Sequence, residues 1–391
     1  MILIFETHPV QYRAPVYQEL EKMIPGQFLV AYASDFSVRG YMDQGFGSKL
    51  AWDIPLLEGY PNLVLNDGKL ESSKVPRFSA RGVDQLIAEH RPKAIVLPHA
   101  FNSPFALAVY FGALRRNIPL WLRMEVQDEA GERGKLKDTV RTMIYRLLYL
   151  PVSRFFYIGN ANKGHYLRHG VNAKKLRQAH YCARNPIEEL SEEERGGRRT
   201  QKRQALGFAE GDLVVAFFGK LIPKKNPALP LNAHPHLSEA VREKLRILYV
   251  GQGEREPDLR TQAQSLSKPG QPVVAIFAGF VNQTSLPDYY LAADIVVLPS
   301  RKMGETWGVV INEALQAGCS VVVSSAVGCS QDFGSWERVR VIPVDDHLAL
   351  ARAIDELSKY PRSFRWAEEG LKEYSVQATA KAIADEMQQL T

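Results

Sequence analysis

The chain has 391 residues, of which 45% are hydrophobic and 24% charged, and its formal net charge at pH 7 is +6. This length favours two domains of about 200 residues over a single core. No apolar run in the sequence approaches the roughly 20 residues that span a bilayer. The dispersed basic residues accompany no nucleic-acid-binding motif, so nucleic acid is not an expected partner.

The first nine residues and the cysteines indicate in which cellular compartment the protein is found. Residues 1–9, MILIFETHP, lack the basic leader of a signal peptide and predict a first buried strand. Cys182, Cys319 and Cys329 are odd in number and have no metal-ligand spacing. We therefore expect a cytoplasmic protein with idle thiols and no bound metal. The mild positive charge would also suit phosphorylated ligands or the inner face of an anionic membrane.

Short apolar runs alternate with helical patterns in the first half of the chain. This alternation predicts a parallel sheet with helices on both faces. The expected strands are 1–5, 28–32, 94–97, 120–123 and 155–158, and the expected helices include 15–23, 82–89, 104–116 and 135–148.

A charged segment, residues 188–206, separates the two halves. It lacks a continuous apolar face, which predicts a linker with a solvated helix. We expect an N-terminal Rossmann-like acceptor domain at 1–186 and a C-terminal Rossmann-like donor domain at 187–362. Helices within 363–391 are expected to cross back to the N-terminal domain.

The second half repeats the alternation more clearly. The expected strands are 214–218, 247–250, 273–277, 295–298, 321–324 and 339–342, and helices are expected at 346–358 and 376–390. The predicted fold is α/β, with two doubly wound parallel-sheet domains facing across a cleft. Ligands of such sheets bind beyond the carboxyl ends of the strands.

Two lysines follow the first strand of the second half. Lys220 comes after Gly219 at the strand end, and Lys225 lies five residues further on. Glycine permits close backbone approach, and two lysines around a turn can converge on one phosphate group. When this segment is taken alone, a solvated loop with three lysines is the better explanation.

Glycines follow the next two strands as well. Gly251 and Gly253 form a Gly-x-Gly pair, which often marks only a tight turn between a strand and a helix. Gly279 and Phe280 follow the strand after that and could let a nucleobase lie against the backbone.

The run ETWGVVINE, residues 305–313, places two carboxylates around an expected helix start at Gly308. A helix N-terminus carries unpaired N–H groups and about half a positive charge, so it can hold an anion. Glu313 would lie about 1.5 turns into the helix, and Glu305 in the loop before it. This outline suits a phosphate joined to two polyhydroxyl groups, although both acids could also be ordinary surface residues.

These four segments, taken in order, resemble the retaining glycosyltransferases of the GT-B fold, in particular family four (glycosyl transferases group 1). The resemblance covers residues 214–332 well, whereas the first half is similar in pattern only. It implies a hexosyltransferase that uses a nucleoside-diphosphate sugar as co-substrate, with no cofactor and no metal. It also implies synthesis of a surface polysaccharide, glycolipid or other glycoconjugate.

The resemblance also implies roles for single residues. Lys220 and Lys225 would hold the donor diphosphate, Glu305 the donor sugar and Glu313 the ribose. The remaining donor-binding positions are Gly219, Gly251, Gly253, Gly279, Phe280, Thr306, Trp307, Gly308, Val309 and Val310.

Two departures from the family pattern stand out. Lys220 replaces an arginine, so the positive charge is kept but the bidentate fork is lost. Thr306 and Trp307 replace Gly-Phe and are expected to narrow the sugar pocket.

The first half supplies candidates for the acceptor side. His99 follows a buried strand, and related enzymes carry a histidine or an acid at this point near the reacting sugar; a hydrogen-bonded loop histidine is the alternative. His8 and Gln11 follow the first strand. Arg123 and Glu125 follow another strand, where they either reach the cleft or form a structural ion pair.

Residues 135–154 mix basic and apolar side chains. This pattern is typical of a helix that lies on an anionic membrane, which would suit a lipid-linked acceptor, or of a core helix with a solvated basic face. Acceptors to be considered are glycans, lipid-linked sugars and small molecules. A degenerate nucleotide-sugar-binding scaffold and a GT-B epimerase remain as alternative functions.

Overall fold

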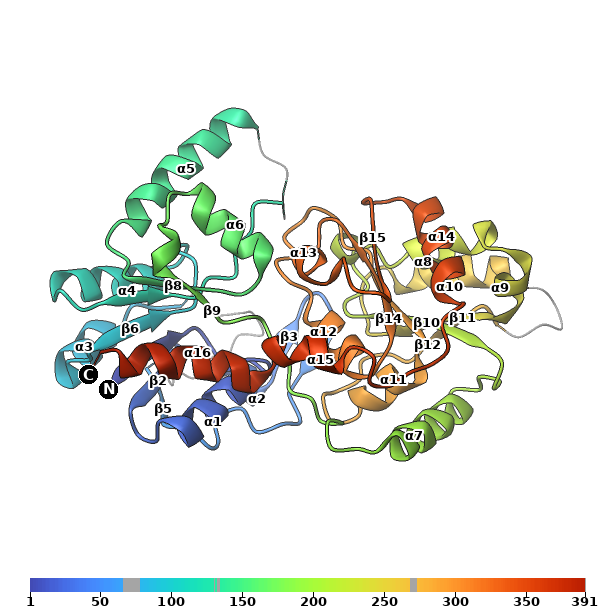
Figure 1. Cartoon of the computed structure of the whole chain (residues 1–391), viewed down its shortest axis with the longest axis horizontal. Helices are drawn as coiled ribbons and strands as arrows, with labels where there is room; N and C mark the ends of the chain where they lie inside the picture. Colours follow the sequence, from blue (N-terminus) through green and yellow to red (C-terminus); the bar gives the residue numbers. More distant parts are fainter. Residues whose placement is uncertain (66–77, 130, 132–133, 268–272, 391) are drawn as a thin grey trace.

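The structure is a computed structural model that describes residues 1–65, 78–129, 131, 134–267 and 273–390. It contains two parallel sheets, one in each half of the chain, which lie side by side with helices around them (Figure 1). The first sheet has the order β5-β2-β1-β6-β7-β8-β9, and the second has the order β12-β11-β10-β13-β14-β15.

The first sheet is formed by β1 (Ile2–Glu6), β2 (Phe28–Tyr32), β5 (Asn62–Val64), β6 (Ala94–Leu97), β7 (Leu120–Leu122), β8 (Arg154–Tyr157) and β9 (Leu176–Gln178). The helices of this half are α1 (Ala14–Met23), α2 (Phe36–Arg39), α3 (Val83–His90), α4 (Pro104–Arg115), α5 (Lys135–Tyr149) and α6 (Asn160–Arg168). The chain builds outward from β1 to β5 and then returns to place β6 on the other side of β1. The strand order therefore reverses between β1 and β6.

The second sheet is formed by β10 (Leu213–Phe218), β11 (Leu245–Val250), β12 (Ala275–Phe277), β13 (Ile295–Leu298), β14 (Ser320–Ser324) and β15 (Val339–Ile342). Its helices are α7 (Glu192–Ala205), α8 (Leu229–Ala233), α9 (Glu239–Lys244), α10 (Glu256–Leu266), α11 (Leu286–Ala292), α12 (Val309–Gln316), α13 (Ser330–Phe333), α14 (His347–Leu357) and α15 (Glu368–Leu371). Here the order reverses between β10 and β13. Such reversal points open a crevice at the carboxyl ends of the strands, where ligands bind.

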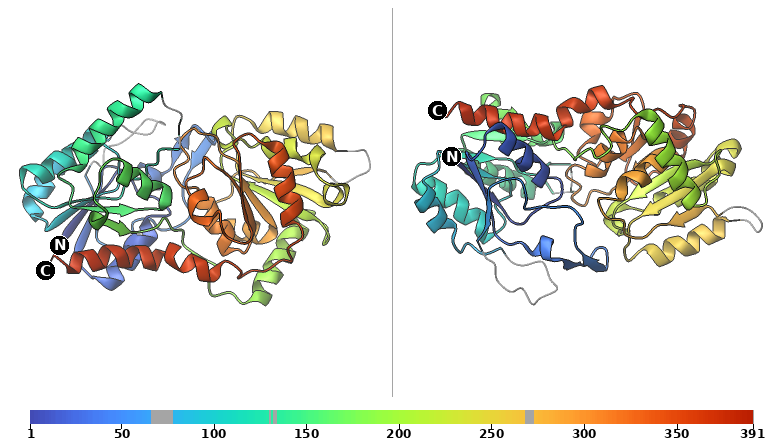
Figure 2. Two further views of the ribbon diagram at one scale, coloured as in Figure 1. Left: turned by 45° about the horizontal axis from the view of Figure 1, so that its top comes forward. Right: turned by 90° about the horizontal axis from the view of Figure 1, so that it is seen from below.

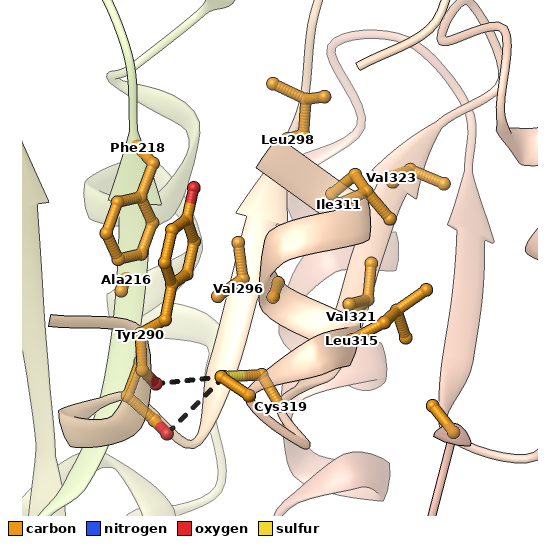
Figure 3. Close-up of a cluster of buried hydrophobic side chains, with 14 of the residues drawn as sticks. Ala216, Phe218, Tyr290, Val296, Leu298, Ile311, Leu315, Cys319, Val321 and Val323 are labelled. Carbon is orange, nitrogen blue, oxygen red and sulfur yellow. Dashed lines mark hydrogen bonds between the residues drawn. The ribbon is translucent and has the colours of Figure 1, made fainter. Parts of the chain in front are cut away.

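Strand β10 shows why these apolar runs become central strands. Its side chains alternate between two cores, with Ala216 and Phe218 on one face of the sheet and Val215 and Phe217 on the other. Figure 3 shows the first of these cores, in which Ile311 of α12 packs over the sheet. A strand buried on both faces reads as a continuous hydrophobic run, which is how these strands were predicted.

The last helix, α16 (Val376–Gln388), lies along the N-terminal half of the chain, beside α1 (Figures 1 and 2). Ala380, Ile383 and Met387 belong to the same core as Ile2 and Ile4 of β1. The C-terminal helix thus completes the N-terminal domain, because its apolar face covers one side of the first sheet.

The predicted strands and long helices are present in the structure within a few residues of their expected ends. Among the residues that the structure describes, four strands were not predicted: β5, β9 and the antiparallel hairpin of β3 (Tyr41–Asp43) and β4 (Ser48–Leu50). Each has three residues, which is too short for a two-residue periodicity to stand out in a sequence.

The helix predicted within 188–206 is present as α7 and is mostly exposed, but it is docked on the second domain rather than free as a linker. Helix α7 begins with a capping box formed by Ser191 and Glu194, and it packs against α11 of the second domain. Its buried side chains are arginines, and both Arg199 and Arg203 pair with Asp294. A helix can therefore dock through buried ion pairs and arginine stems, which a search for an apolar stripe overlooks.

Candidate functional site

A cavity of about 740 Å³ lies between the two domains. Both domains and the connection between them line it, and it opens where both strand orders reverse. The predicted residues among its lining are His8, Gln11, Gly219, Lys220, Lys225, Gly251, Phe280, Val309, Val310 and Glu313. The other predicted residues, which lie behind or beside this lining, are His99, Arg123, Glu125, Gly253, Gly279, Glu305, Thr306, Trp307 and Gly308.

The strand-end glycines allow neighbouring loops to touch. A Cβ atom on Gly251 would lie 2.0 Å from the carbonyl oxygen of Gly219, and one on Gly253 would lie 2.5 Å from that of Leu221. Gly219 itself has a φ of 129°, a conformation that favours glycine. These glycines are therefore needed for packing, because they let the loop after β10, which carries the lysines, lie directly against the loop after β11.

Glu305 and Lys225 form an ion pair at the edge of the cavity. The hydroxyl of Ser300 donates to the same carboxylate at 3.1 Å, and Glu305 is buried. Two groups that the sequence places 80 residues apart are thereby held together at the carboxyl end of β13. A sugar hydroxyl that reached this carboxylate would share it with Lys225.

Gly308, the predicted helix start, is the N-cap of α12, which begins at Val309. The first turn of α12 faces the cavity through Val309 and Val310. Gly308 has a φ of 101°, and a Cβ there would lie 2.6 Å from a side-chain methyl of Leu298. Only glycine therefore fits this helix start. The unpaired N–H groups of the first turn give this wall of the cavity a partial positive charge.

Glu313 lines the cavity from the second turn of α12. Burial raises the pKa of its carboxyl to about 7, although a hydrogen bond of 2.6 Å from the Tyr290 hydroxyl opposes this change. Tyr290 is in turn stacked on Phe218 of β10, with ring centroids 3.9 Å apart (Figure 3). Glu313 is thus held by a rigid aromatic pair rather than projecting into solvent, which sets aside the alternative of an ordinary surface residue.

Lys220 meets a partner that the sequence did not suggest. Its ammonium lies 2.8 Å from the carboxylate of Asp43, in the β3–β4 hairpin of the N-terminal domain, and 5.1 Å from the ring centroid of Phe46. Phe46 also makes an edge contact with Phe280 at 5.2 Å. The hairpin therefore reaches across the cleft and covers both predicted donor-binding residues.

The expectation that Trp307 narrows a sugar pocket was wrong for its side chain. The indole is 2% exposed and packs among Tyr181, Phe333 and Tyr374, while its N–H donates to Asn312 at 2.7 Å. Its backbone carbonyl accepts a hydrogen bond from Cys329. The ring faces the core at the domain junction because that junction supplies the aromatic surface it needs.

A buried charged cluster lies at the carboxyl ends of β1 and β6. His99 Nε2 lies 2.8 Å from a carboxylate oxygen of Glu6 and 3.1 Å from the backbone nitrogen of Thr7. Arg13 bridges Glu6 and Glu125. Burial alone would raise the pKa of Glu6, but Arg13 and His99 hold it at about 2, so this carboxylate is ionised. Arg13, which directly precedes α1, was missed because its two carboxylate partners lie in other elements.

The other acceptor-side candidates separate into two groups. His8 and Gln11 line the cavity, and burial lowers the pKa of His8 to about 4, which leaves its imidazole neutral at pH 7. Arg123 is buried and donates to the carbonyls of Ala179 and His180. The alternative of an Arg123–Glu125 ion pair was wrong, because Glu125 pairs with Arg13 instead.

Contacts across the cleft hold the domains together around this cavity. The Gln127 amide donates to the backbone carbonyl of Glu305 at 2.7 Å, and the backbone N–H of Asn160 donates to Asp332 at 3.1 Å. Burial raises the pKa of Asp332 to about 6. The two domains are thus in direct contact beside the cavity.

One group of possible metal ligands lies apart from the cavity. Asp128, His165 and His169 place three ligand atoms within 4.8 Å of one another between α5 and α6. The Asp128 carboxylate is also ion-paired with Arg141. A cation at this point would have to displace a guanidinium, so the cluster is better understood as an anchor between the two helices.

Known proteins match this architecture. Residues 198–373 match the family model of glycosyl transferases group 1. An uncharacterized glycosyltransferase of Methanocaldococcus jannaschii, MJ1607, is 32% identical over 126 residues, which are 32% of this chain and 30% of that protein. A D-inositol 3-phosphate glycosyltransferase of Catenulispora acidiphila is 31% identical over 203 residues, 49% of this chain and 46% of that protein.

These matches span less than half the length of the curated relatives. The likeness in fold is wider. The crystal structure of Anabaena Alr3699/HepE in complex with UDP and glucose superposes with a TM-score of 0.69 at 17% identity and covers 100% of both chains. The chain has the GT-B fold, and residues 198–373 of its C-terminal half are similar to the glycosyl transferases group 1 family.

Proposed function

We propose that this protein is a retaining glycosyltransferase that moves a sugar from a nucleoside-diphosphate sugar to an acceptor hydroxyl. The observation that carries the proposal is the convergence of Lys220, Lys225 and the first turn of α12 on one interdomain cavity. The N-terminus of α12, Lys225 beside Glu305, and Lys220 once it is released from Asp43 would together bind a donor diphosphate. The carboxylates of Glu305, in the loop before α12, and of Glu313, in its second turn, could accept hydrogen bonds from hydroxyl groups of the donor.

The chemistry follows from where charge develops. As the glycosidic bond breaks, negative charge builds on the leaving diphosphate. Preorganised cations and helix N–H groups stabilise such charge most effectively when water is excluded. Lys220, Lys225 and the α12 N-terminus are placed for this role, so we propose that no divalent metal is needed. The leaving phosphate would take the proton of the acceptor hydroxyl on the same face of the sugar, which retains the anomeric configuration.

The N-terminal wall of the cavity would receive the acceptor. His8 and Gln11 line this wall, and the neutral imidazole of His8 can either donate or accept a hydrogen bond. His99 is hydrogen-bonded behind the wall, which favours the alternative of a loop histidine with a structural role. We propose a glycan, lipid-linked or small-molecule acceptor, reached from the cytoplasm.

The experiment that tests the proposal is a measurement of nucleoside diphosphate released from a panel of nucleotide sugars. UDP-sugars come first because UDP is bound in the related HepE structure. Glu305→Gln should lower kcat by about a hundredfold or more, since it removes a contact to the reacting sugar and leaves Lys225 without its partner. The exposed acid Glu337 offers a matched control, as Glu337→Gln should act like the wild type.

Two other outcomes would point to the alternatives. Donor binding in a calorimeter without any release of diphosphate, whatever acceptor is supplied, would indicate a binding scaffold. Conversion of the sugar to its epimer, independent of an acceptor, would indicate an epimerase. Either result would overturn transferase activity while leaving the donor site in place.

A further inference from the structure

Helix α5 runs along the outer edge of the N-terminal domain (Figures 1 and 2). Tyr149 is the one buried residue along its length, so the alternative of a core helix was wrong. Its apolar side chains are instead open to solvent: Leu136 is 78% exposed, Val140 48%, Met143 61%, Ile144 51%, Leu147 67% and the following Leu150 72%.

These apolar residues form one continuous stripe. At about 100° of rotation per residue, the six positions fall within an arc of roughly 120°. Lys137 lies on one border of this arc, while Lys135 and Arg146 lie on the other, and all three are exposed. The apolar stripe is therefore flanked on both sides by positive charge.

The opposite face of α5 is firmly attached to the protein. The Tyr149 hydroxyl lies 2.9 Å from His165 Nε2, and the Tyr145 ring makes an edge contact with the same histidine at 5.0 Å. Arg141 pairs with Asp128, and the Tyr110 hydroxyl of α4 donates to the backbone carbonyl of Leu148 at 3.0 Å. The exposed apolar stripe therefore belongs to a helix that is held in a fixed position on the domain.

We propose that this α5 stripe lies flat on an anionic lipid bilayer. An apolar arc with lysines and arginines along its borders suits the boundary between acyl chains and acidic headgroups, where the stripe is buried and the cations meet phosphate. Within the described residues, no helix is long and apolar enough to cross a membrane, so this contact is peripheral.

A second copy of the chain would fit this stripe less well. A stripe that packed against itself would bring the basic borders of the two helices together, and like charges along a helix pair oppose association. Asp138, the one acid within α5, is already paired with Arg168. An anionic surface would attract the basic side chains on both sides of the apolar stripe.

The test is vesicle flotation, which requires no transfer activity and so is independent of the proposed function. The wild type should float with vesicles of phosphatidylcholine and phosphatidylglycerol, and less with phosphatidylcholine alone. A variant with Leu136→Ser, Met143→Ser and Leu147→Ser should bind the anionic vesicles roughly tenfold more weakly or worse. Lys135→Glu with Lys137→Glu should show a similar loss that removes the preference for anionic lipid.

The control is Leu348→Ser, which changes an exposed leucine on α14 and should float like the wild type. Thermal melting of each variant checks that the fold is kept, as expected for exposed positions. The proposal is overturned if the wild type does not float with anionic vesicles, or if the triple variant floats as well as the wild type. Sedimentation that shows a dimer dependent on Leu136, Met143 and Leu147 would also overturn it, in favour of a second copy.

Discussion

The carboxylate of Asp43 lies 2.8 Å from the ammonium nitrogen of Lys220, although the two residues belong to different domains. Burial alone would raise the pKa of Asp43, but Lys220 and the backbone N–H groups of Phe46 and Gly45 hold it below its usual range. The lysine proposed to bind the donor diphosphate is therefore already neutralised by a carboxylate in this arrangement. If Lys220 binds the donor as proposed, the donor would have to displace Asp43, and the β3–β4 hairpin would oppose binding until it moved.

This pairing predicts that Asp43→Asn tightens the binding of nucleoside diphosphate by about threefold to tenfold, because a partly buried ion pair of this kind is worth about 1 kcal/mol. Isothermal titration calorimetry would measure the change. Asp53→Asn is the matched control, since Asp53 also crosses the cleft but contacts Thr284 rather than a lysine. An equal effect of both substitutions would mean that loosened domains, and not the freed Lys220, explain the gain.

Glu313 predicts an unusual dependence of stability on pH. Its pKa in the folded protein is about 7, above the ordinary value of 4.5. The folded state therefore favours the protonated acid, and the stability from this group is present below pH 4.5 and is lost as the pH rises through 7. Glu313→Gln keeps an acceptor for Tyr290 and should stabilise the protein by about 1–3 kcal/mol at pH 8, with little effect near pH 4.5.

Chemical denaturation at the two pH values would measure this difference. Glu337→Gln, at an exposed position, should change stability at neither pH. The same gain for Glu313→Gln at both pH values would show that its carboxyl titrates normally. Because Glu313 is also proposed to hold the ribose, the stabilised variant should bind donor more weakly.

We expect a substitution of Trp307 to lower the stability of the protein without changing which nucleotide sugar it prefers. Trp307→Phe removes the hydrogen bond to Asn312 and part of a buried ring, which should lower the free energy of unfolding by about 1–3 kcal/mol. The preference among nucleotide sugars should stay within about twofold, since the indole faces the domain junction. Urea denaturation and a donor panel check both parts. If the variant ranked the donors differently but was as stable as the wild type, the indole of Trp307 would contact the donor sugar rather than the domain junction.

Metal removal provides a test of the catalytic proposal. Two lysines and a helix N-terminus would supply the positive charge at the leaving group, so transfer should continue within about twofold in excess EDTA. Lys220→Met should lower kcat by about a hundredfold, and added Mg²⁺ should not restore it. Activity that disappears in EDTA and returns with Mg²⁺ would show that the lysines act together with a metal.

Local patterns accounted for most of the fold. The runs that became β2, β6 and β13 were predicted with their observed bounds, because a strand buried on both faces must be apolar throughout. The start of α12 was also predictable, since Gly308 is the one residue of its motif that can adopt a positive φ freely. Short or unusually docked elements, such as the β3–β4 hairpin and the arginine face of α7, carry no such local signal.

The candidate site divides in a similar way. Lys220, Lys225 and Glu313 were found from their positions after strands, and the structure places all three on one cavity. Arg13 and Asp43 were not predicted as site residues. Each is part of the site only through an ion pair with a residue of another element or domain, which the sequence does not reveal.

By itself, the sequence determined the two parallel sheets, their order along the chain and the strand ends at which charged residues gather. These properties follow from hydrophobic periodicity and backbone conformation, which act within a few residues. Only the tertiary structure decided that Trp307 turns into the domain junction, that Lys220 is paired with Asp43, and that α5 leaves its apolar face uncovered. Each of these three outcomes depends on contacts between residues that are far apart in the sequence. A pattern that extends over a few residues contains no information about such contacts.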